Sequence, residues 1–161
     1  SKDTSMEEHI LRDLIKFFKR EKINYPDCIL WLRPTHPLRD KDTFNKAYNR
    51  FKRNKKTVMV VHKVDSRLFK SRKKFLYPIN DKMKKKSMLR SQDTKPLYSI
   101  FSGEFFRLSK KININFLGKQ KTYVLAPKYT NFDIDNIVDL NILQNLIKFN
   151  YKVYKKFLHN K

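Results

Sequence analysis

Two short segments of this chain combine reactive residue types with spacings that would hold them in place. Because proline fixes the backbone φ angle at about −65° and lacks an amide donor, a loop with two prolines holds its side chains in set directions. Residues 133–135 place two carboxylates two residues apart. The loop is residues 32–40, with Arg33, Pro34, Thr35, His36, Pro37 and Arg39.

The carboxylates of Asp133 and Asp135 would point to the same side of an extended chain. Two carboxylates on one side suit Mg²⁺, which binds through one or two carboxylates and the phosphates of a substrate. Asp135 would alternatively cap a helix that begins at Asn136, since a side-chain acceptor there satisfies free amide groups. Capping leaves Asp133 without a role, and on the residues alone both interpretations stay open. Asp139 is expected to be a helix residue rather than a ligand.

The elements around the loop alternate in the way that α/β proteins do. Residues 28–32 are a solid apolar run, which predicts a buried parallel strand over 28–33. Residues 41–53 form an amphipathic helix capped by Asp40, and residues 58–62 form a second buried strand. We expect the two strands to be parallel neighbours joined by a right-handed crossover. Functional groups of open α/β sheets collect at the carboxyl ends of strands, so the loop and residues 133–135 should meet there.

The remaining sequence continues a single domain of 161 residues, with one basic excursion. Residues 63–90 hold eleven Lys and Arg but only two Asp, and they show no periodicity. The sequence therefore predicts an α/β fold with a mostly parallel sheet and a protruding extension. The other expected elements are a helix over 6–22 with a capping box from Ser5 to Glu8, strands over 98–101, 105–108 and 122–125, and a long helix over 136–158.

Composition narrows the classes of protein. No run approaches the ~20 apolar residues of a membrane-spanning helix. A lone Cys28 excludes an internal disulfide and fits a reducing compartment, so we expect a cytoplasmic location. The net charge of +23 favours an anionic partner. The charge has two explanations. One is a basic nucleic-acid-binding module, and the other is the codon bias of an AT-rich genome, which the many Lys, Asn and Ile residues also fit.

Residues 32–39 resemble the L-Q-P-T-S-P-L-R segment of the acylneuraminate cytidylyltransferases, also called CMP-sialic acid synthetases. Arg33 stands where the family has Gln, and His36 stands where it has Ser. The resemblance implies that this loop, through Arg33, Thr35 and Arg39, belongs to the catalytic site and shapes the pocket for the sugar and the nucleotide.

Residues 132–140 are similar to the family's closing I-D-I-D-x-x-x-D-L segment, in which the D-x-D pair holds the catalytic metal. The resemblance therefore favours a metal role for Asp133 and Asp135 over helix capping. The metal that it implies is Mg²⁺, which would neutralise the phosphates of CTP.

A further segment is similar to the family's R-x-Q-x-x-P…N-G pattern, and it implies that Arg90, Gln92, Ser102 and Gly103 bind the substrate. Arg90 would bind the carboxylate of a nine-carbon nonulosonic sugar acid in bidentate fashion. The alternative is a solvated arginine in a basic run. Ser102 stands where the family has Asn, and Gly103 would allow a close approach of the backbone.

The resemblance assigns residues 63–97 to a basic dimerisation extension. In the family, the lysine and arginine that Lys70 and Arg90 resemble reach the neighbouring subunit's site, which implies a homodimer. For Lys70 the alternative is an ordinary surface lysine. Ser5 ends a segment that looks like the family's D-T-(A/S) turn near the cytidine, and the alternative is simple helix capping by Ser5.

The family's R-x-G-S-K-G loop, which cradles the CTP triphosphate, has no counterpart here, since the only glycines are Gly103 and Gly118. We therefore expect an incomplete cytidylyltransferase domain, the carboxyl-terminal part of a Rossmann-like nucleotidyltransferase fold, that is inactive alone. The implied reaction transfers CMP from CTP to a nonulosonic acid and releases pyrophosphate. The alternatives are a non-catalytic remnant of the family and the nucleic-acid-binding module.

Overall fold

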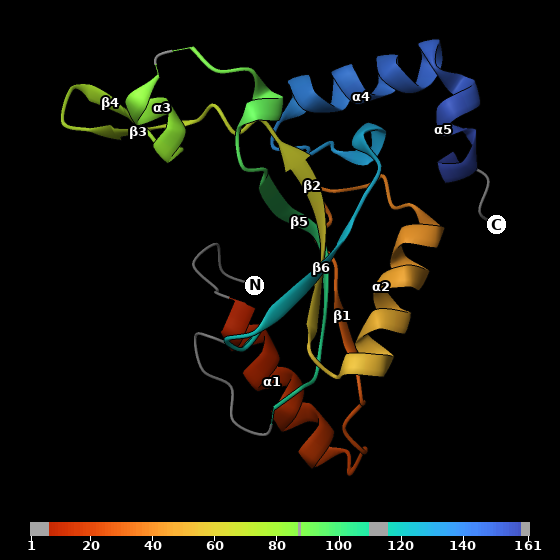
Figure 1. Ribbon diagram of the computed structural model, residues 1–161. Helices are drawn as coiled ribbons and strands as arrows, with labels where there is room; N and C mark the ends of the chain where they lie inside the picture. Colours follow the sequence, from red (N-terminus) through yellow and green to blue (C-terminus); the bar gives the residue numbers. More distant parts are fainter. Residues whose placement is uncertain (1–6, 87, 110–115, 159–161) are drawn as a thin grey trace.

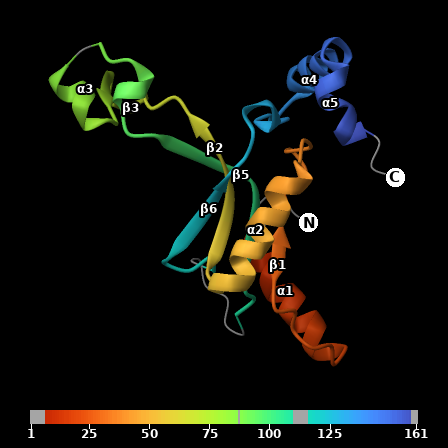
Figure 2. The same ribbon diagram turned by 45° about the vertical axis from the view of Figure 1, so that its right-hand side comes forward.

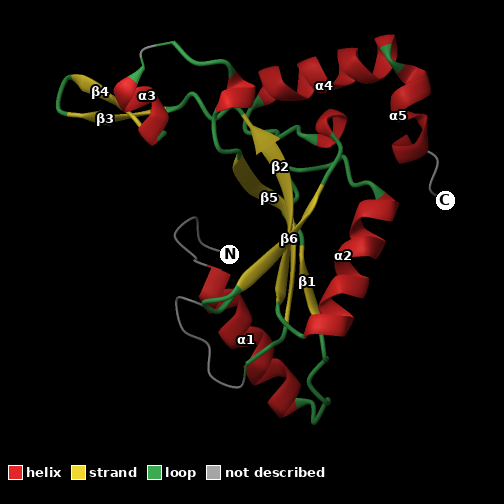
Figure 3. Cartoon of the chain, in the orientation of Figure 1, coloured by secondary structure: helices red, strands yellow, loops and turns green. Residues whose placement is uncertain are grey.

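A computed structural model of the protein describes residues 7–86, 88–109 and 116–158. The architecture is mixed α/β, with a four-stranded sheet flanked by helices and a small hairpin that stands apart (Figures 1 and 3). The elements in chain order are α1 (Glu7–Arg20), β1 (Ile29–Trp31), α2 (Lys41–Asn54), β2 (Thr57–Val64), β3 (Phe69–Arg72), β4 (Phe75–Pro78), α3 (Asp81–Lys85), η1 (Ser91–Asp93), β5 (Leu97–Phe106), β6 (Lys121–Leu125), η2 (Lys128–Thr130), α4 (Ile137–Phe149) and α5 (Tyr151–Leu158).

The four-stranded sheet has the order β1-β5-β2-β6. β5 runs antiparallel to both β1 and β2, whereas β2 and β6 pair in parallel. The expectation that strands 28–33 and 58–62 are neighbours in a mostly parallel sheet is therefore wrong, because β5 lies between them. Gly103 interrupts the apolar run of β5, so the sequence reads as two short strands. The single strand of ten residues is long enough to pair with β1 at one end and with β2 along most of its length.

The helices α1 and α2 cover opposite faces of the sheet. Neighbouring residues of a strand point to opposite faces, and Phe105 and Phe106 of β5 belong to two different clusters of buried side chains. Phe105 packs with α2, and Phe106 packs with α1. The buried members of the α2 cluster are Ala47, Phe51, Val58, Val60, Phe105, Val124 and Ala126, and those of the α1 cluster are Leu11, Ile15, Phe106 and Leu108.

The last two helices hold the loop after β1. Leu38 of that loop packs with Leu143 of α4 and Tyr154 of α5 in a third cluster. The expected single helix over 136–158 is instead two helices, because α4 ends at Phe149 and the chain turns at Asn150 into α5 (Figure 1). This break brings Tyr154 onto Leu38. In the parts of the chain that are described, no helix has the length and apolar character needed to cross a membrane.

Residues 65–86 leave the sheet as an arm directly after β2, as Figures 1 and 2 show from two directions. The arm contains the antiparallel pair β3 and β4 and the short helix α3. Nearly every residue of the two strands is exposed on both faces of the hairpin. Strands are recognised in a sequence by apolar residues that alternate toward a buried face, and this hairpin has no such face. The expected protrusion is observed, whereas the strands inside it were missed.

Candidate functional site

The loop after β1 and the segment before α4 meet at one edge of the sheet. The amide of Ile134 donates a hydrogen bond to the carbonyl oxygen of Thr35 at 2.9 Å. Beside it, Nδ1 of the buried His36 lies 3.1 Å from Oδ1 of Asp133. The expected meeting of these segments at the carboxyl end of β1 is therefore observed. The side chain of Thr35 itself is exposed.

The loop is held in shape by its own polar groups. Nη2 of Arg39 donates to the carbonyl oxygen of Arg33 at 2.6 Å, and the amide of His36 donates to the same oxygen at 3.1 Å. Asp40 caps α2 as expected, because its Oδ2 accepts from the amide and the hydroxyl of Thr43 at 3.0 and 2.7 Å. Burial lowers the pKa of the Arg39 guanidinium. The two prolines and these bonds leave the loop little freedom.

Arg33 lies between two carboxylates. Its Nη1 donates to Oε1 of Glu7 at 3.2 Å, and its Nη2 lies 3.8 Å from Oε1 of Glu104. Glu104 is only 2% exposed, and its carboxylate oxygens form no hydrogen bond within the described residues. Burial raises the pKa of Glu104 to about 7; Arg33 opposes this rise and Glu7 adds to it. Backbone and Arg33 hydrogen bonds hold the pKa of Glu7 below its usual value.

Sequence reasoning missed Glu104. The signal was present, since Glu104 is the one charged residue in the ten residues of β5. A lone carboxylate in an otherwise uncharged strand is buried at a cost unless a cation accompanies it. Arg33 is that cation, and it is also a position where this chain departs from the family that it resembles.

The buried His62 of β2 is hydrogen-bonded to residues of β5 and of η2. Nε2 of His62 lies 2.9 Å from Oγ1 of Thr130, and Nδ1 lies 3.2 Å from Oγ of Ser102. The Thr130 hydroxyl donates to the carbonyl oxygen of Pro127, so it accepts from Nε2–H, and Ser102 then donates to Nδ1. Burial, with some repulsion from His36, lowers the pKa of His62 to about 4, so the ring is neutral. The centroids of the two histidine rings are 6.3 Å apart.

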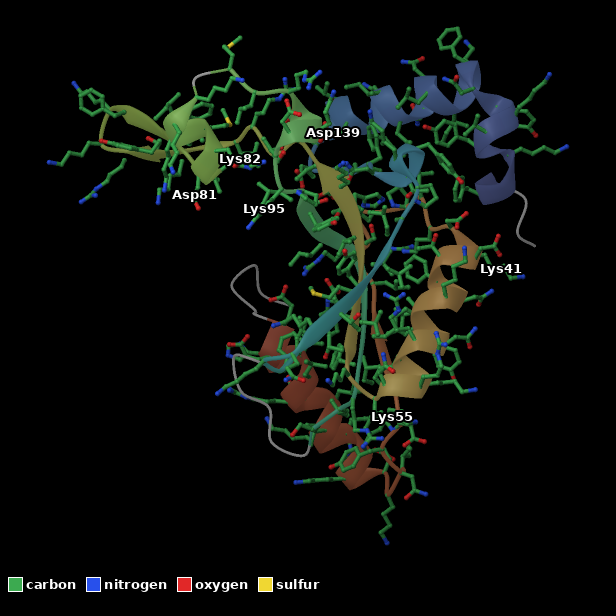
Figure 4. The ribbon with its side chains drawn as sticks, viewed as in Figure 1. Lys41, Lys55, Asp81, Lys82, Lys95 and Asp139 are labelled. Carbon is green, nitrogen blue, oxygen red and sulfur yellow. The ribbon has the colours of Figure 1, made fainter. Side chains whose placement is uncertain are left out.

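The residue that caps α4 is Asn136 and not Asp135 of the D-x-D segment. Asn136 is the N-cap, since its Oδ1 accepts from the amides of Val138 and Asp139 at 2.8 and 3.1 Å. Asp139 closes a capping box through the amides of Asp135 and Asn136, and it lies at the start of α4 (Figure 4). The capping interpretation of Asp135 is therefore wrong, and Asp139 is a helix residue as expected. Asp135 is exposed.

The structure does not bring the other expected substrate residues to the loop. Lys70 lies on β3 of the arm, and Arg90 forms an exposed ion pair with Asp93 at 3.0 Å. No hydrogen bond or ion pair joins Lys70, Arg90 or the exposed Gln92 to residues 32–40 in the described part of the chain. Ser5 lies outside the described residues.

Ser102 and Gly103 both have structural partners. The Ser102 hydroxyl is buried against His62. A Cβ atom on Gly103 would lie 2.9 Å from Cε1 of Phe44 and 3.1 Å from Cδ2 of Leu32, which explains a glycine at this position by close packing.

This edge of the sheet therefore gathers polar groups of several kinds. They are the guanidinium groups of Arg33 and Arg39, the His36–Asp133 contact, the buried carboxyl group of Glu104, and the exposed Thr35 and Asp135. Such a set suits an anionic ligand held with a metal ion. Among the residues described, no group of three or more His, Cys, Asp or Glu side chains is arranged to hold a metal by itself. Comparison with models of protein families finds no match for this chain, and comparison with curated proteins finds none either.

Proposed function

We propose that this chain contributes the sugar-acid and metal side of a nucleotidyltransferase site of the acylneuraminate cytidylyltransferase kind. The anomeric hydroxyl of a nonulosonic acid would attack the α-phosphate of CTP, and pyrophosphate would leave. The contact between residues 32–40 and residues 133–135 supports this most, because two segments that resemble the family meet at one sheet edge. Open α/β sheets bind their ligands at such edges, and we treat this sheet as part of a Rossmann-like fold.

Asp133 and Asp135 are the residues that would hold Mg²⁺. Oδ1 of Asp133 faces Nδ1 of His36 at 3.1 Å, but the Asp133 side chain as a whole is 36% exposed and can still meet a ligand, and Asp135 is exposed two residues further on. Two carboxylates leave most of the octahedral shell to phosphates and water, which is how Mg²⁺ binds in phosphoryl-transfer enzymes. When bound, the ion would neutralise charge on the phosphates. His36 would position the Asp133 carboxylate.

The arginines of the loop would divide two tasks. Glu7 and Glu104 take up much of the charge of Arg33, so we assign Arg33 to holding the loop in shape. Arg39 forms no ion pair with a carboxylate of the described residues, and its one hydrogen bond is to a carbonyl oxygen, so Arg39 is the cation that we assign to the anionic substrate. Thr35 offers an exposed hydroxyl at the tip of the loop.

The arm has a place in this proposal as a dimerisation element. Lys70 is exposed on the arm, and Arg90 and Gln92 are exposed where the chain returns to β5; all three would meet the sugar carboxylate in the site of a second subunit. Ser102 and Gly103 would act indirectly, by holding β5 against His62 and Phe44. A homodimer would therefore carry two composite sites.

Binding of the two proposed ligands tests the site directly. We expect Mg²⁺ with N-acetylneuraminic acid to shift the backbone amide resonances of residues 133–136 and of the residues of 32–40 other than Pro34 and Pro37, with the shifts lost in Asp133→Asn. The control Asp81→Asn removes an exposed carboxylate from the arm, where it pairs with Lys84, and should leave the shifts unchanged. Shifts that persist in Asp133→Asn, or that spread evenly over the chain, would refute the metal assignment.

Turnover tests the expectation about the missing phosphate loop. We expect the 161 residues alone to release no pyrophosphate from CTP, Mg²⁺ and a nonulosonic acid, because no segment of the sequence resembles the family's triphosphate loop. Pyrophosphate release above the level of an Asp133→Asn sample would contradict this expectation and would place the CTP site within these residues.

A further inference from the structure

The sheet face opposite α2 carries a pair of exposed tyrosines. Tyr98 of β5 pairs with Lys63, and Tyr123 of β6 pairs with Met59, so the two tyrosines stand on either side of β2. Val124 packs with α2, which places its neighbour Tyr123 on the other face. The ring centroids are 4.9 Å apart and the hydroxyl oxygens 3.3 Å apart, so the rings meet above β2. Tyr98 is 36% exposed and Tyr123 is 45% exposed.

A hollow of about 390 Å³ lies at the carboxyl ends of the parallel strands β2 and β6, and its lining residue Lys63 is the cross-strand partner of Tyr98. Lys63 of β2 lies directly across from Tyr98 of β5, so the two side chains are on the same face of the sheet. Lys128 follows shortly after the end of β6. No hydrogen bond or ion pair engages either ammonium group in the described part of the chain. The hollow is lined by Lys63, Val64, Asp65, Leu125, Ala126 and Lys128.

The one carboxylate of the hollow is already compensated. Asp65 forms an ion pair with Arg67, and its Oδ1 accepts from the Arg67 amide at 2.9 Å. Lys63 and Lys128 therefore give the hollow an excess of positive charge, and Lys63 connects it to the tyrosine pair as the cross-strand partner of Tyr98. Aromatic faces bind planar rings of ligands by stacking, and ammonium groups bind phosphate oxygens. The volume falls within the roughly 300–1,000 Å³ of ordinary small-ligand sites.

We propose that this surface binds a nucleotide, with the base stacked on Tyr98 and Tyr123 and the phosphate between Lys63 and Lys128. A sugar or an apolar peptide would use the rings but would leave two ammonium groups without a partner. The site is separate from Asp133 and Asp135 and does not depend on the reaction proposed for them. Its ligand is either a free mononucleotide or one nucleotide of a single strand, since both present the same base and phosphate.

Saturation-transfer NMR with uridine monophosphate as the probe tests the site. We expect saturation to reach the uracil protons, and we expect Tyr123→Ser and Lys63→Gln each to weaken binding by roughly tenfold. Tyr123→Phe should bind almost as well as the parent, because it keeps the ring. The matched controls are Tyr48→Ser and Lys46→Gln, which change exposed residues of α2 on the opposite face. Thermal unfolding of each variant shows whether it is folded.

Three results would overturn the proposal. An equal loss in Lys46→Gln and Lys63→Gln would mean that the net charge alone attracts the nucleotide. Equal binding of uridine and uridine monophosphate would remove the role of the two lysines. Inorganic phosphate that displaces uridine monophosphate completely at equal concentration would remove the role of the rings. An octauridylate strand that binds tighter, with the same dependence on Tyr123, would support a single strand as the source, and equal affinity would support a free nucleotide.

Discussion

Glu104 and His62 are buried near the same sheet edge, and burial shifts their pKa values in opposite directions. The pKa of Glu104 is raised to about 7, and the pKa of His62 is lowered to about 4. Glu104 therefore stabilises the fold most below its ordinary pKa of 4.5, and this contribution is lost as pH rises through 7. His62 stabilises the fold most above its ordinary pKa of 6.5, and this contribution is lost as pH falls through 4.

Between pH 4.5 and 6.5 the free energy of unfolding should change little with pH, because the contribution of Glu104 falls as pH rises while the contribution of His62 increases. We expect Glu104→Gln to make the free energy of unfolding rise with pH over this window, by up to roughly 3 kcal/mol. His62→Gln should instead make the free energy of unfolding fall as pH rises, by a similar amount. Urea unfolding at several pH values measures both profiles.

The control for this experiment is Asp13→Asn, which neutralises an exposed carboxylate of α1 that pairs with Lys16 and should leave the window nearly flat. Identical profiles for the parent, Glu104→Gln and His62→Gln would show that neither group titrates with a shifted pKa.

Gly103 allows a second prediction at the scale of a residue. We expect Gly103→Ala to destabilise the fold by about 1–3 kcal/mol, because its Cβ would lie 2.9 Å from the Phe44 ring. The double variant with Phe44→Leu should recover part of this loss, since the smaller side chain leaves room. Chemical denaturation of the four proteins in a double-mutant cycle gives the coupling energy. Additive effects would contradict the packing explanation and would leave the substrate-binding interpretation of Gly103 in place.

The types of residue at the sheet edge were predictable, but their partners were not. The loop with Arg33, Thr35 and Arg39 and the pair Asp133 and Asp135 stand out because their spacing is unusual. The buried contacts of Glu104 depend on which strand lies beside β1, and one sequence does not contain that information. The pairing of Glu104 with Arg33 became visible only when β5 took its place beside β1.

At the scale of the element, α4 begins with a capping box that gives a clear prediction. We expect Asn136→Ala to lower the free energy of unfolding by about 1 kcal/mol, because the amides of Val138 and Asp139 lose their acceptor. Asp135→Asn should leave stability unchanged, since the Asp135 side chain accepts no capping bond. Thermal unfolding compares the two variants. A larger loss in Asp135→Asn would restore the capping role that the geometry denies it.

Elements with a buried stripe were predicted well, and elements without one were not. The helices over 6–22 and 41–53 were expected close to the observed α1 and α2, because each has apolar residues on one face and suitable charges at its ends. The hairpin of the arm has no buried face, and the order of the strands depends on long-range pairing. A local pattern does not determine either of them.

At the scale of the whole molecule, a strong positive charge coexists with exposed apolar side chains. The net charge is +23, while Phe75 and Leu76 at the tip of the arm are 66% and 69% exposed. An isolated two-stranded hairpin is only marginally stable in water, so the arm gains from a partner. Mutual repulsion between copies opposes that association at low salt.

Salt should therefore promote self-association. Raising NaCl from 50 mM to 1 M shortens the screening length to about 3 Å, and we expect the sedimentation coefficient to rise toward that of a dimer. Phe75→Ser with Leu76→Ser should keep the chain monomeric at both salt concentrations. The control Phe149→Ser changes an exposed aromatic residue of α4 and should not affect association. Dimers that form equally in all variants would exclude the arm as the interface.

The position of β5 in the sheet also determines at which point of its synthesis the chain can form the sheet. Neither β1 nor β2 pairs with an element that precedes β5: β1 pairs with β5 alone, and β2 pairs with β5 and with the later β6. A nascent chain that ends before Leu97 thus has no hydrogen bond of the four-stranded sheet, although both of its helices that flank the sheet have been made. At about 5–20 residues per second, β1 waits several seconds on the ribosome for its partner. During that time its free edge is open to other strands, so the step most exposed to aggregation falls before residue 97 emerges.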